Sequence, residues 1–212
     1  MNKQLSDSMN KYQVAYIDRL RMGSDGKGIR SLIIFQQCSL RCKYCINSFT
    51  WDGSEEENWM DIHEIYKRVL ADKLYIKATN GGVTFGGGEP LLQSDAIKEF
   101  SKIDTEGFSI DVETSLYVPK ENLENVVHII DMFYVDIKTT DPEIYKAYTD
   151  GEVKIPLDNL KYLINLVGPE KIVVRIPVIP GFTDKANQKA TMNDLKSHYG
   201  VKHFDLFEYR IP

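Results

Sequence analysis

The sequence lacks any apolar run long enough to cross a bilayer, and its first ten residues are polar. A spanning helix needs about 20 apolar residues, and a secretory signal peptide needs an apolar core of its own. We therefore expect no membrane partner and a cytoplasmic location. An excess of positive charge is also missing, because 26 basic residues face 31 acidic ones and the net charge is -5. Such a chain has no overall field for a phosphate backbone, so nucleic acid is not an expected partner.

Cysteine is scarce, with three residues in 212, and an odd, low number argues against a secreted disulfide scaffold. The remaining composition is that of an ordinary globular protein, 42% hydrophobic and 27% charged. The length predicts a single domain over residues 1–212. Within it, we interpret residues 1–22 as an N-terminal extension and residues 30–209 as the folded body.

Short apolar runs alternate with stretches of helical periodicity along the chain. Strands are predicted at 30–37, 82–87, 108–115, 133–139, 171–178 and 203–209. Helices are predicted at 60–72, 94–103, 120–130, 155–166 and 184–199. The strand runs are nearly continuous rather than alternating, as in strands covered on both faces. An α/β fold with parallel strands follows, either an open doubly wound sheet or a barrel, with its ligand site at the carboxyl ends of the strands.

All three cysteines, Cys38, Cys42 and Cys45, fall within eight residues directly after the first predicted strand. Three thiolates on one short loop can bind a tetrahedral zinc ion or three irons of a cubane cluster. A closed zinc site needs a fourth cysteine or histidine, and the four histidines are remote in sequence. A cubane with three cysteine ligands instead leaves one iron open to a ligand. The cysteines alone also permit a binding module, either a zinc-stabilised fold or a redox-sensing cluster.

The spacing C-x-x-x-C-x-aromatic-C, with Tyr44 as the aromatic residue, resembles the cluster loop of the radical SAM superfamily. Further segments resemble the glycyl-radical-enzyme activases of that superfamily. They are Asp-Gly-Lys-Gly-Ile-Arg at 25–30, with Lys27 where proline is usual, the glycine-rich string at 83–93, and the segments 134–138 and 174–184. The resemblance covers residues 23–209 and implies a partial six-unit (β/α) barrel of parallel strands.

The same resemblance implies the activity. One 4Fe-4S cluster on the three cysteines would reduce S-adenosylmethionine (SAM) to a 5'-deoxyadenosyl radical, which takes hydrogen from a glycine of a partner glycyl radical enzyme. It further implies a one-electron donor such as flavodoxin or ferredoxin, and an oxygen-sensitive enzyme of anaerobic metabolism. No catalytic side chain is assigned, because the cofactor carries the chemistry. A radical SAM enzyme acting on a small molecule or a peptide is kept as the alternative.

No cysteine-rich insert separates Cys45 from Gly87, so a second cluster is not expected. The resemblance places the SAM amino group at Gly87 and Gly88. Lys138 could pair with the SAM carboxylate, and a structural ion pair explains it equally well. Glu113 and Asp136 could hold ribose hydroxyls or a cation, but a structural ion pair explains each equally well. The predicted SAM contacts are Tyr44, Gly87, Gly88, Glu89, Glu113, Ser115, Asp136, Ile137, Lys138, Arg175 and Arg210.

The expected roles of two of these residues, Arg175 and Arg210, depend on which groups lie next to them. Arg175 interrupts an apolar strand and needs a carboxylate, from SAM or from a neighbouring side chain, to be buried there. Arg210 stands where the activases carry a histidine near the adenine, so we expect the adenine contacts to differ. The acidic run at 54–57, between Trp51 and Trp59, is predicted to be a solvated loop.

Overall fold

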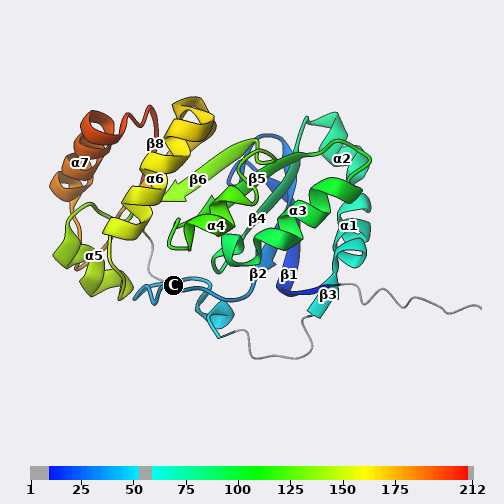
Figure 1. Cartoon of the computed structure of the whole chain (residues 1–212), viewed down its shortest axis with the longest axis horizontal. Helices are drawn as coiled ribbons and strands as arrows, with labels where there is room; N and C mark the ends of the chain where they lie inside the picture. The colour runs from blue at the N-terminus through cyan, green and yellow to red at the C-terminus, as the bar shows by residue number, and fades with distance from the viewer. Residues whose placement is uncertain (1–9, 53–58, 210–212) are drawn as a thin grey trace, which may run out of the picture.

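The computed structural model describes residues 10–52 and 59–209, and in these residues eight strands form a single sheet (Figure 1). The spatial order is β3-β1-β2-β4-β5-β6-β7-β8, and neighbouring strands from β2 to β8 pair in parallel. The strands are β1 (Lys11–Met22), β2 (Ile29–Phe35), β3 (Trp59–Asp61), β4 (Gly82–Gly87), β5 (Ser109–Thr114), β6 (Met132–Asp136), β7 (Ile172–Val178) and β8 (His203–Glu208). The predicted parallel α/β fold is confirmed, and each of the six predicted strands is present.

The helices follow the strands in sequence, and α3, α4 and α6 cross one face of the sheet in Figure 1. They are α1 (Ile62–Leu70), α2 (Lys73–Ala78), α3 (Ser94–Ile103), α4 (Lys120–Glu124), α5 (Pro142–Thr149), α6 (Lys154–Val167) and α7 (Lys185–Asp194). Capping explains several starts: the Asp141 carboxylate accepts from the first amides of α5, and Asp184 forms a capping box with Asn187. The predicted helix at 120–130 is shorter than expected, because α4 ends at Glu124 and turns follow.

The segment interpreted as an N-terminal extension contributes a twelve-residue strand to the sheet. β1 runs antiparallel to β2, from the pair Val14 and Phe35 to the pair Met22 and Ile29, with two irregularities in register. Some of its polar side chains are paired with other parts of the chain although they are partly exposed. Arg19, for example, donates to both carboxylate oxygens of Asp72 at 2.6 Å. β1 is therefore part of the sheet itself, paired along its length with β2.

The core lies between the sheet and its helices and includes the stacked rings of Phe35 and Phe85, whose centroids are 5.6 Å apart. Complete burial of side chains of this size stabilises the fold by about 1.5–3 kcal/mol each.

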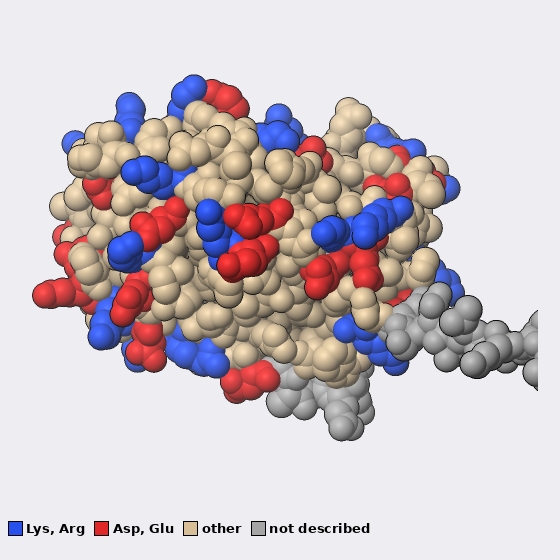
Figure 2. All heavy atoms as spheres, in the orientation of Figure 1, with Lys and Arg blue, Asp and Glu red and all other residues tan. Residues whose placement is uncertain are grey.

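Across the surface of the helix-covered face, basic and acidic side chains are interspersed (Figure 2). Among the described residues, no helix has both the length and the apolar character to cross a membrane.

A buried ion pair ties together the amino-terminal ends of three strands. Arg30, 2% exposed, lies 3.1 Å from an Asp111 oxygen and donates to the Thr84 hydroxyl at 2.6 Å. Thr84 in turn donates to the Asp25 carbonyl at 2.6 Å. A Cβ at Gly26 would lie 2.5 Å from an Asp111 oxygen. The segment 25–30 is thus shaped by the packing of its glycine and arginine against β4 and β5.

Candidate functional site

A cavity of about 420 Å³ lies inside the curve of the sheet, at the carboxyl ends of the central parallel strands. Its volume falls within the range of small-molecule sites, roughly 300–1,000 Å³. The sequence-predicted residues that line it are Cys38, Cys42, Cys45, Gly87, Gly88, Glu113, Ser115, Asp136, Lys138 and Arg175. Side chains separated by more than 130 positions therefore meet at one mouth, as expected for parallel strands.

The loop that carries the cysteines is held by backbone hydrogen bonds on both sides. At its start, the Gln37 amide donates to the Thr50 carbonyl at 2.6 Å. In its middle, the Arg41 amide donates to the Thr149 carbonyl at 2.8 Å, and the Lys43 amide donates to the Tyr148 carbonyl at 2.9 Å. These contacts fix the backbone on either side of Cys42. The loop is thus presented to the cavity by α5.

The three thiols are free, and burial raises the pKa of Cys38 to about 12 and that of Cys42 to about 11. Without metal these two thiols are therefore protonated at neutral pH. Within residues 10–52 and 59–209, no three Cys, His, Asp or Glu side chains converge as ligands of a single ion. In a cubane each cysteine binds a different iron, so its thiols stand further apart than the ligands of one zinc ion. The choice between a cluster and a zinc ion at these cysteines stays a prediction.

The two glycines at the end of β4 are required by the fold itself. Gly87 has a φ of +102°, and a Cβ there would lie 2.5 Å from Cγ2 of Ile34. A Cβ on Gly88 would lie 2.1 Å from the Gln37 carbonyl oxygen, at the start of the cysteine loop. Only glycine lets β4 and the loop approach this closely. That their backbone also contacts SAM stays a prediction.

Glu89 is 1% exposed and its carboxylate is bound within the chain rather than facing the cavity. It accepts from the Thr114 hydroxyl at 2.6 Å, and from the amide and hydroxyl of Ser115 at 2.9 and 2.6 Å. The Leu91 amide adds a fourth bond at 3.2 Å. Burial raises the pKa of Glu89, and the hydrogen bonds oppose that rise. Glu89 therefore fastens the end of β4 to the end of β5.

Replacing Glu89 with glutamine should lower the free energy of unfolding of the metal-free protein by about 2–4 kcal/mol. The NH2 group of the glutamine would face hydrogen-bond donors that the carboxylate of Glu89 accepts from, and these donors would lose their acceptor. Urea unfolding followed by circular dichroism measures the change. The Glu121→Gln protein is the matched control, since that carboxylate is exposed in the first turn of α4. Equal stability of the two variants would contradict the fastening role.

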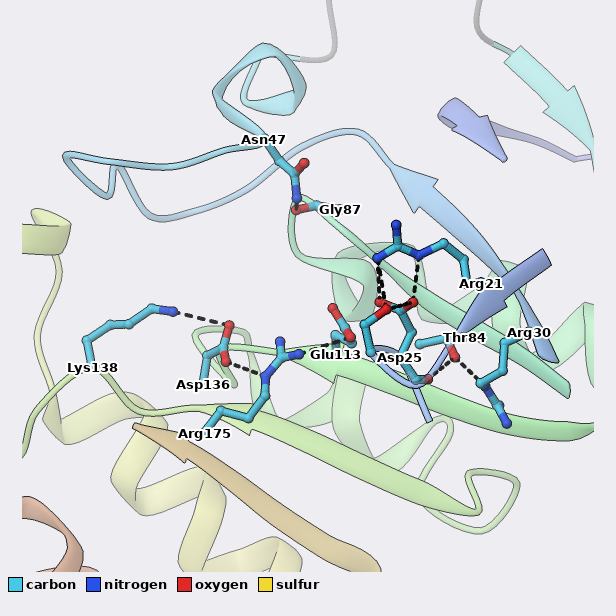
Figure 3. Close-up of polar contacts among 11 residues, drawn as sticks. Arg21, Asp25, Arg30, Asn47, Thr84, Gly87, Glu113, Asp136, Lys138 and Arg175 are labelled. Carbon is cyan, nitrogen blue, oxygen red and sulfur yellow. Dashed lines mark hydrogen bonds and ion pairs between the residues drawn. The ribbon is translucent and has the colours of Figure 1, made fainter. Parts of the chain in front are cut away.

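Four charged side chains form a chain of ion pairs along the cavity wall (Figure 3). Lys138 Nζ lies 3.2 Å from Asp136 Oδ2, and Arg175 Nε lies 2.7 Å from Asp136 Oδ1. Arg175 Nη1 also lies 3.0 Å from Glu113 Oε1. Asp136 and Arg175 are register partners of β6 and β7, which explains their contact. Arg175 thus has carboxylate partners inside the chain, one of the two sources that the sequence left open.

The two carboxylates in this row of ion pairs have pKa values that shift in opposite directions. Burial opposes ionisation of Asp136, but the Arg175 guanidinium and the Lys138 ammonium outweigh it and hold the Asp136 pKa at about 2. For Glu113 burial prevails, helped by the negative charge of Asp136, and its pKa is raised. Asp136 is accordingly the fixed anion of the cavity wall.

Several cavity residues were missed by sequence reasoning. Arg21 donates to Asp25 at 2.7 Å and to Asp18 at 3.0 Å, and all three line the cavity from β1 and the turn after it. Tyr148 and Tyr209 also line it. Arg21, Asp18 and Tyr148 lie on β1 and α5, neither of which was predicted, whereas Tyr209 is the last residue of the strand predicted at 203–209.

Tyr44 does not line the cavity itself, but it lies in a group of aromatic rings that includes the lining residues Tyr148 and Tyr209. Its ring centroid is 6.1 Å from that of Tyr148, 5.9 Å from Phe182 and 6.5 Å from Tyr209. The Tyr209 hydroxyl donates to the Tyr44 carbonyl. These rings form an apolar wall next to the cysteine loop.

The other predicted site residues have separate positions. Ile137 is fully buried, and its amide donates to the Arg175 carbonyl at 3.2 Å, so it lies behind the cavity wall. Arg210 lies outside the described residues, as does the acidic run at 54–57. Their predicted roles stay predictions.

The chain is similar in sequence to a known superfamily and to several activating enzymes. The radical SAM superfamily profile matches residues 32–190. The pyruvate formate-lyase-activating enzyme of Clostridium pasteurianum is 34% identical over 189 residues, which cover 87% of this chain and 77% of that protein. The (2S)-3-sulfopropanediol dehydratase activating enzyme of Klebsiella oxytoca is 40% identical over 147 residues, covering 68% of this chain and 45% of that protein.

A solved structure supports the same grouping. A domain of the pyruvate-formate lyase-activating enzyme from Bacteroides vulgatus superposes with a TM-score of 0.53 at 26% identity. The match covers 62% of this chain and 85% of that domain. The similarity therefore extends from the sequence motifs to the arrangement of the strands.

Proposed function

This chain belongs to the radical SAM superfamily, and we propose that it is an activating enzyme that installs a glycyl radical on a partner enzyme. The observation that carries the proposal is the meeting of three free thiols, two fold-required glycines and an ion-pair chain around one cavity. The names of the relatives support the activating role, because one is an activating enzyme of pyruvate formate-lyase and the other of (2S)-3-sulfopropanediol dehydratase. The protein substrate would be one glycine of such a partner.

Cys38, Cys42 and Cys45 are the proposed ligands of one 4Fe-4S cluster, since they are free and line the same cavity. When bound, the cluster and SAM supply a 5'-deoxyadenosyl radical, formed by one electron from a donor such as flavodoxin or ferredoxin. The protein's part is to position these groups and to keep water away from them.

The cavity wall offers partners for each polar end of SAM. Lys138 is the proposed partner of its carboxylate, and the presence of the ammonium in the cavity beside Asp136 supports this. The backbone at Gly87 and Gly88 would face its amino group, and Glu113 and Asp136 would face its ribose. The remaining proposed contacts among the described residues are Ser115 and Arg175, which line this space, and Tyr44, Glu89 and Ile137, which contact residues that line it. Arg210 lies outside the described residues, and its contact stays a prediction.

The test is anaerobic and has two stages. The protein is reconstituted with iron and sulfide, reduced with dithionite and mixed with SAM, and 5'-deoxyadenosine is quantified. It is then incubated with pyruvate formate-lyase or sulfopropanediol dehydratase, and the glycyl radical is sought by electron paramagnetic resonance. Cleavage of SAM together with a partner radical is expected.

Two outcomes would overturn the proposal at different levels. Cleavage of SAM without a radical on either partner, but stimulated by a small molecule or a peptide, would place the chain in the alternative class. Stoichiometric zinc without iron or sulfide would remove the cluster and leave a binding module.

A further inference from the structure

One side of the cavity mouth carries exposed apolar side chains. Tyr16 of β1 and Ile46, which follows the last cysteine of the loop, both line the cavity and are 44% and 65% exposed. Phe49 is 58% exposed and stacks on Tyr16, with ring centroids 6.1 Å apart. Scattered exposed apolar residues are ordinary, but a group of them at the entrance of a cavity marks a binding surface. We call Tyr16, Ile46 and Phe49 the apolar rim.

The backbone around the rim is fixed. The side chain of Asn47, the residue after Ile46, donates to the Gly87 carbonyl at 3.0 Å (Figure 3). Thr50, the residue after Phe49, is fully buried, and its hydroxyl donates to the Asn47 carbonyl at 2.7 Å. Ile46 and Phe49 are therefore exposed on a backbone that is fastened to the end of β4.

The rim lies on the β1 and β2 side of the cavity, away from the ion-pair chain on β6 and β7. Tyr16 is the register partner of Ile34, which also lines the cavity. The charged side chains Asp18 and Arg21 of β1 pair with each other at 3.0 Å. An apolar group bound on this side would thus meet apolar surface, while the polar ends of SAM would face the ion-pair chain.

We propose that Tyr16 and Ile46 are specificity-determining residues that bind an apolar side chain next to the substrate glycine of the partner polypeptide. The inference rests on the proposed function and names the sequence that this function would prefer. Glycine has no side chain to recognise, so its neighbours must provide the specificity. Residues of an extended chain follow one another at about 3.3–3.6 Å, so the neighbours of a glycine in the cavity lie at its mouth. An apolar neighbour there removes its own surface and that of the rim from water.

The test measures peptide binding to the protein reconstituted with iron and sulfide, with SAM and without reductant, so that no turnover occurs. Two fluorescein-labelled heptapeptides with a central glycine are compared by fluorescence anisotropy, one with leucine on both sides of the glycine and the other with serine. Wild type should bind the leucine peptide about tenfold more tightly, because burial of one apolar side chain contributes this much or more. Ile46→Ser and Tyr16→Thr should each reduce the ratio of the two affinities to about threefold or less.

Two further variants make the ratio specific to the rim. Ile46→Leu keeps an apolar side chain and should keep the wild-type ratio. Leu74→Ser is the matched control, because Leu74 is 77% exposed on α2 and does not line the cavity. Because both affinities are measured on the same protein, a partly unfolded fraction leaves their ratio unchanged. Equal binding of the two peptides to wild type, an unchanged ratio in both rim variants, or an equal loss in Leu74→Ser would overturn the proposal.

Other occupants of the rim give different results. Slower reduction of the Ile46→Ser protein by flavodoxin but not by dithionite, with an unchanged ratio, would assign the rim to the electron donor. A wild-type dimer in analytical ultracentrifugation that this variant dissociates, again with an unchanged ratio, would assign it to a second copy of the chain. Both results would overturn the proposal. A glycyl radical on a full-length partner without the peptide preference would overturn this inference alone. The peptide preference without a radical on any partner would instead overturn the proposed function.

Discussion

The reconstituted Cys42→Ala protein should form no detectable 5'-deoxyadenosine and should retain only a small part of the wild-type iron. The loss should exceed about 100-fold, because even groups that merely hydrogen-bond to metal ligands contribute about 10–100-fold in metal affinity. Cys42 is the central cysteine, and its neighbours on both sides are fixed to α5 by backbone bonds. No other described thiol can take its place, since the chain has only three cysteines.

Iron and sulfide content, the visible absorption of the cluster and 5'-deoxyadenosine yield measure this result. Ser39→Ala is the matched control, because Ser39 is exposed on the same loop and precedes Leu40 without being a proposed ligand. That control should load iron and cleave SAM like wild type. A Cys42→Ala protein with full iron content and unchanged cleavage would mean that the cysteines are not the cluster site.

The strands of the fold were predictable because their residues are apolar in continuous runs. Most residues of β2 and β7 are buried, and their runs SLIIF and IVVRIPV give a clear signal in the sequence, whereas β8 is largely exposed. β1 was missed because Asp18, Arg19 and Arg21 interrupt it. The partner of Arg19 is Asp72, 53 positions away, and a partner at that separation is invisible to a local pattern.

The helix α5 was missed for a related reason. Its buried face is made of Tyr145, Tyr148 and Thr149, residue types that give little hydrophobic periodicity. Its start is nevertheless encoded, because Asp141 caps it and Pro142 occupies its first turn. A search for capping residues in the stretch after β6 would have found it.

The site was predictable where its residues are contiguous in sequence. The cysteine loop and the string from Gly87 to Glu89 each lie in one short segment, so spacing alone identifies them. The contact of Arg175 with Asp136 depends instead on the register of β6 and β7. A single sequence does not contain that register, so Arg175 was left with two possible partners.

The Arg175→Gln protein should lose about 3–5 kcal/mol of unfolding free energy, because its removal leaves a buried charge without its counterion. In wild type, two cations and two carboxylates balance in this wall, and Arg175 is the only one of the four that contacts both acids. Without it, Asp136 and Glu113 repel one another with Lys138 as the remaining cation. Urea unfolding of the metal-free protein measures the loss.

The neutral double variant separates this electrostatic account from a loss of packing. Arg175→Gln combined with Glu113→Gln restores the balance of charge, so it should be more stable than the sum of the two single changes predicts, with a coupling energy of about 1–3 kcal/mol. Lys202→Gln is the control for a surface pair, because Lys202 and Glu170 are both exposed, and it should leave stability nearly unchanged. Additive losses in the double variant would mean that the Arg175 side chain acts through its packing. Since Asp136 also faces Lys138, the same balance of charge governs how freely Lys138 can bind an anion in the cavity.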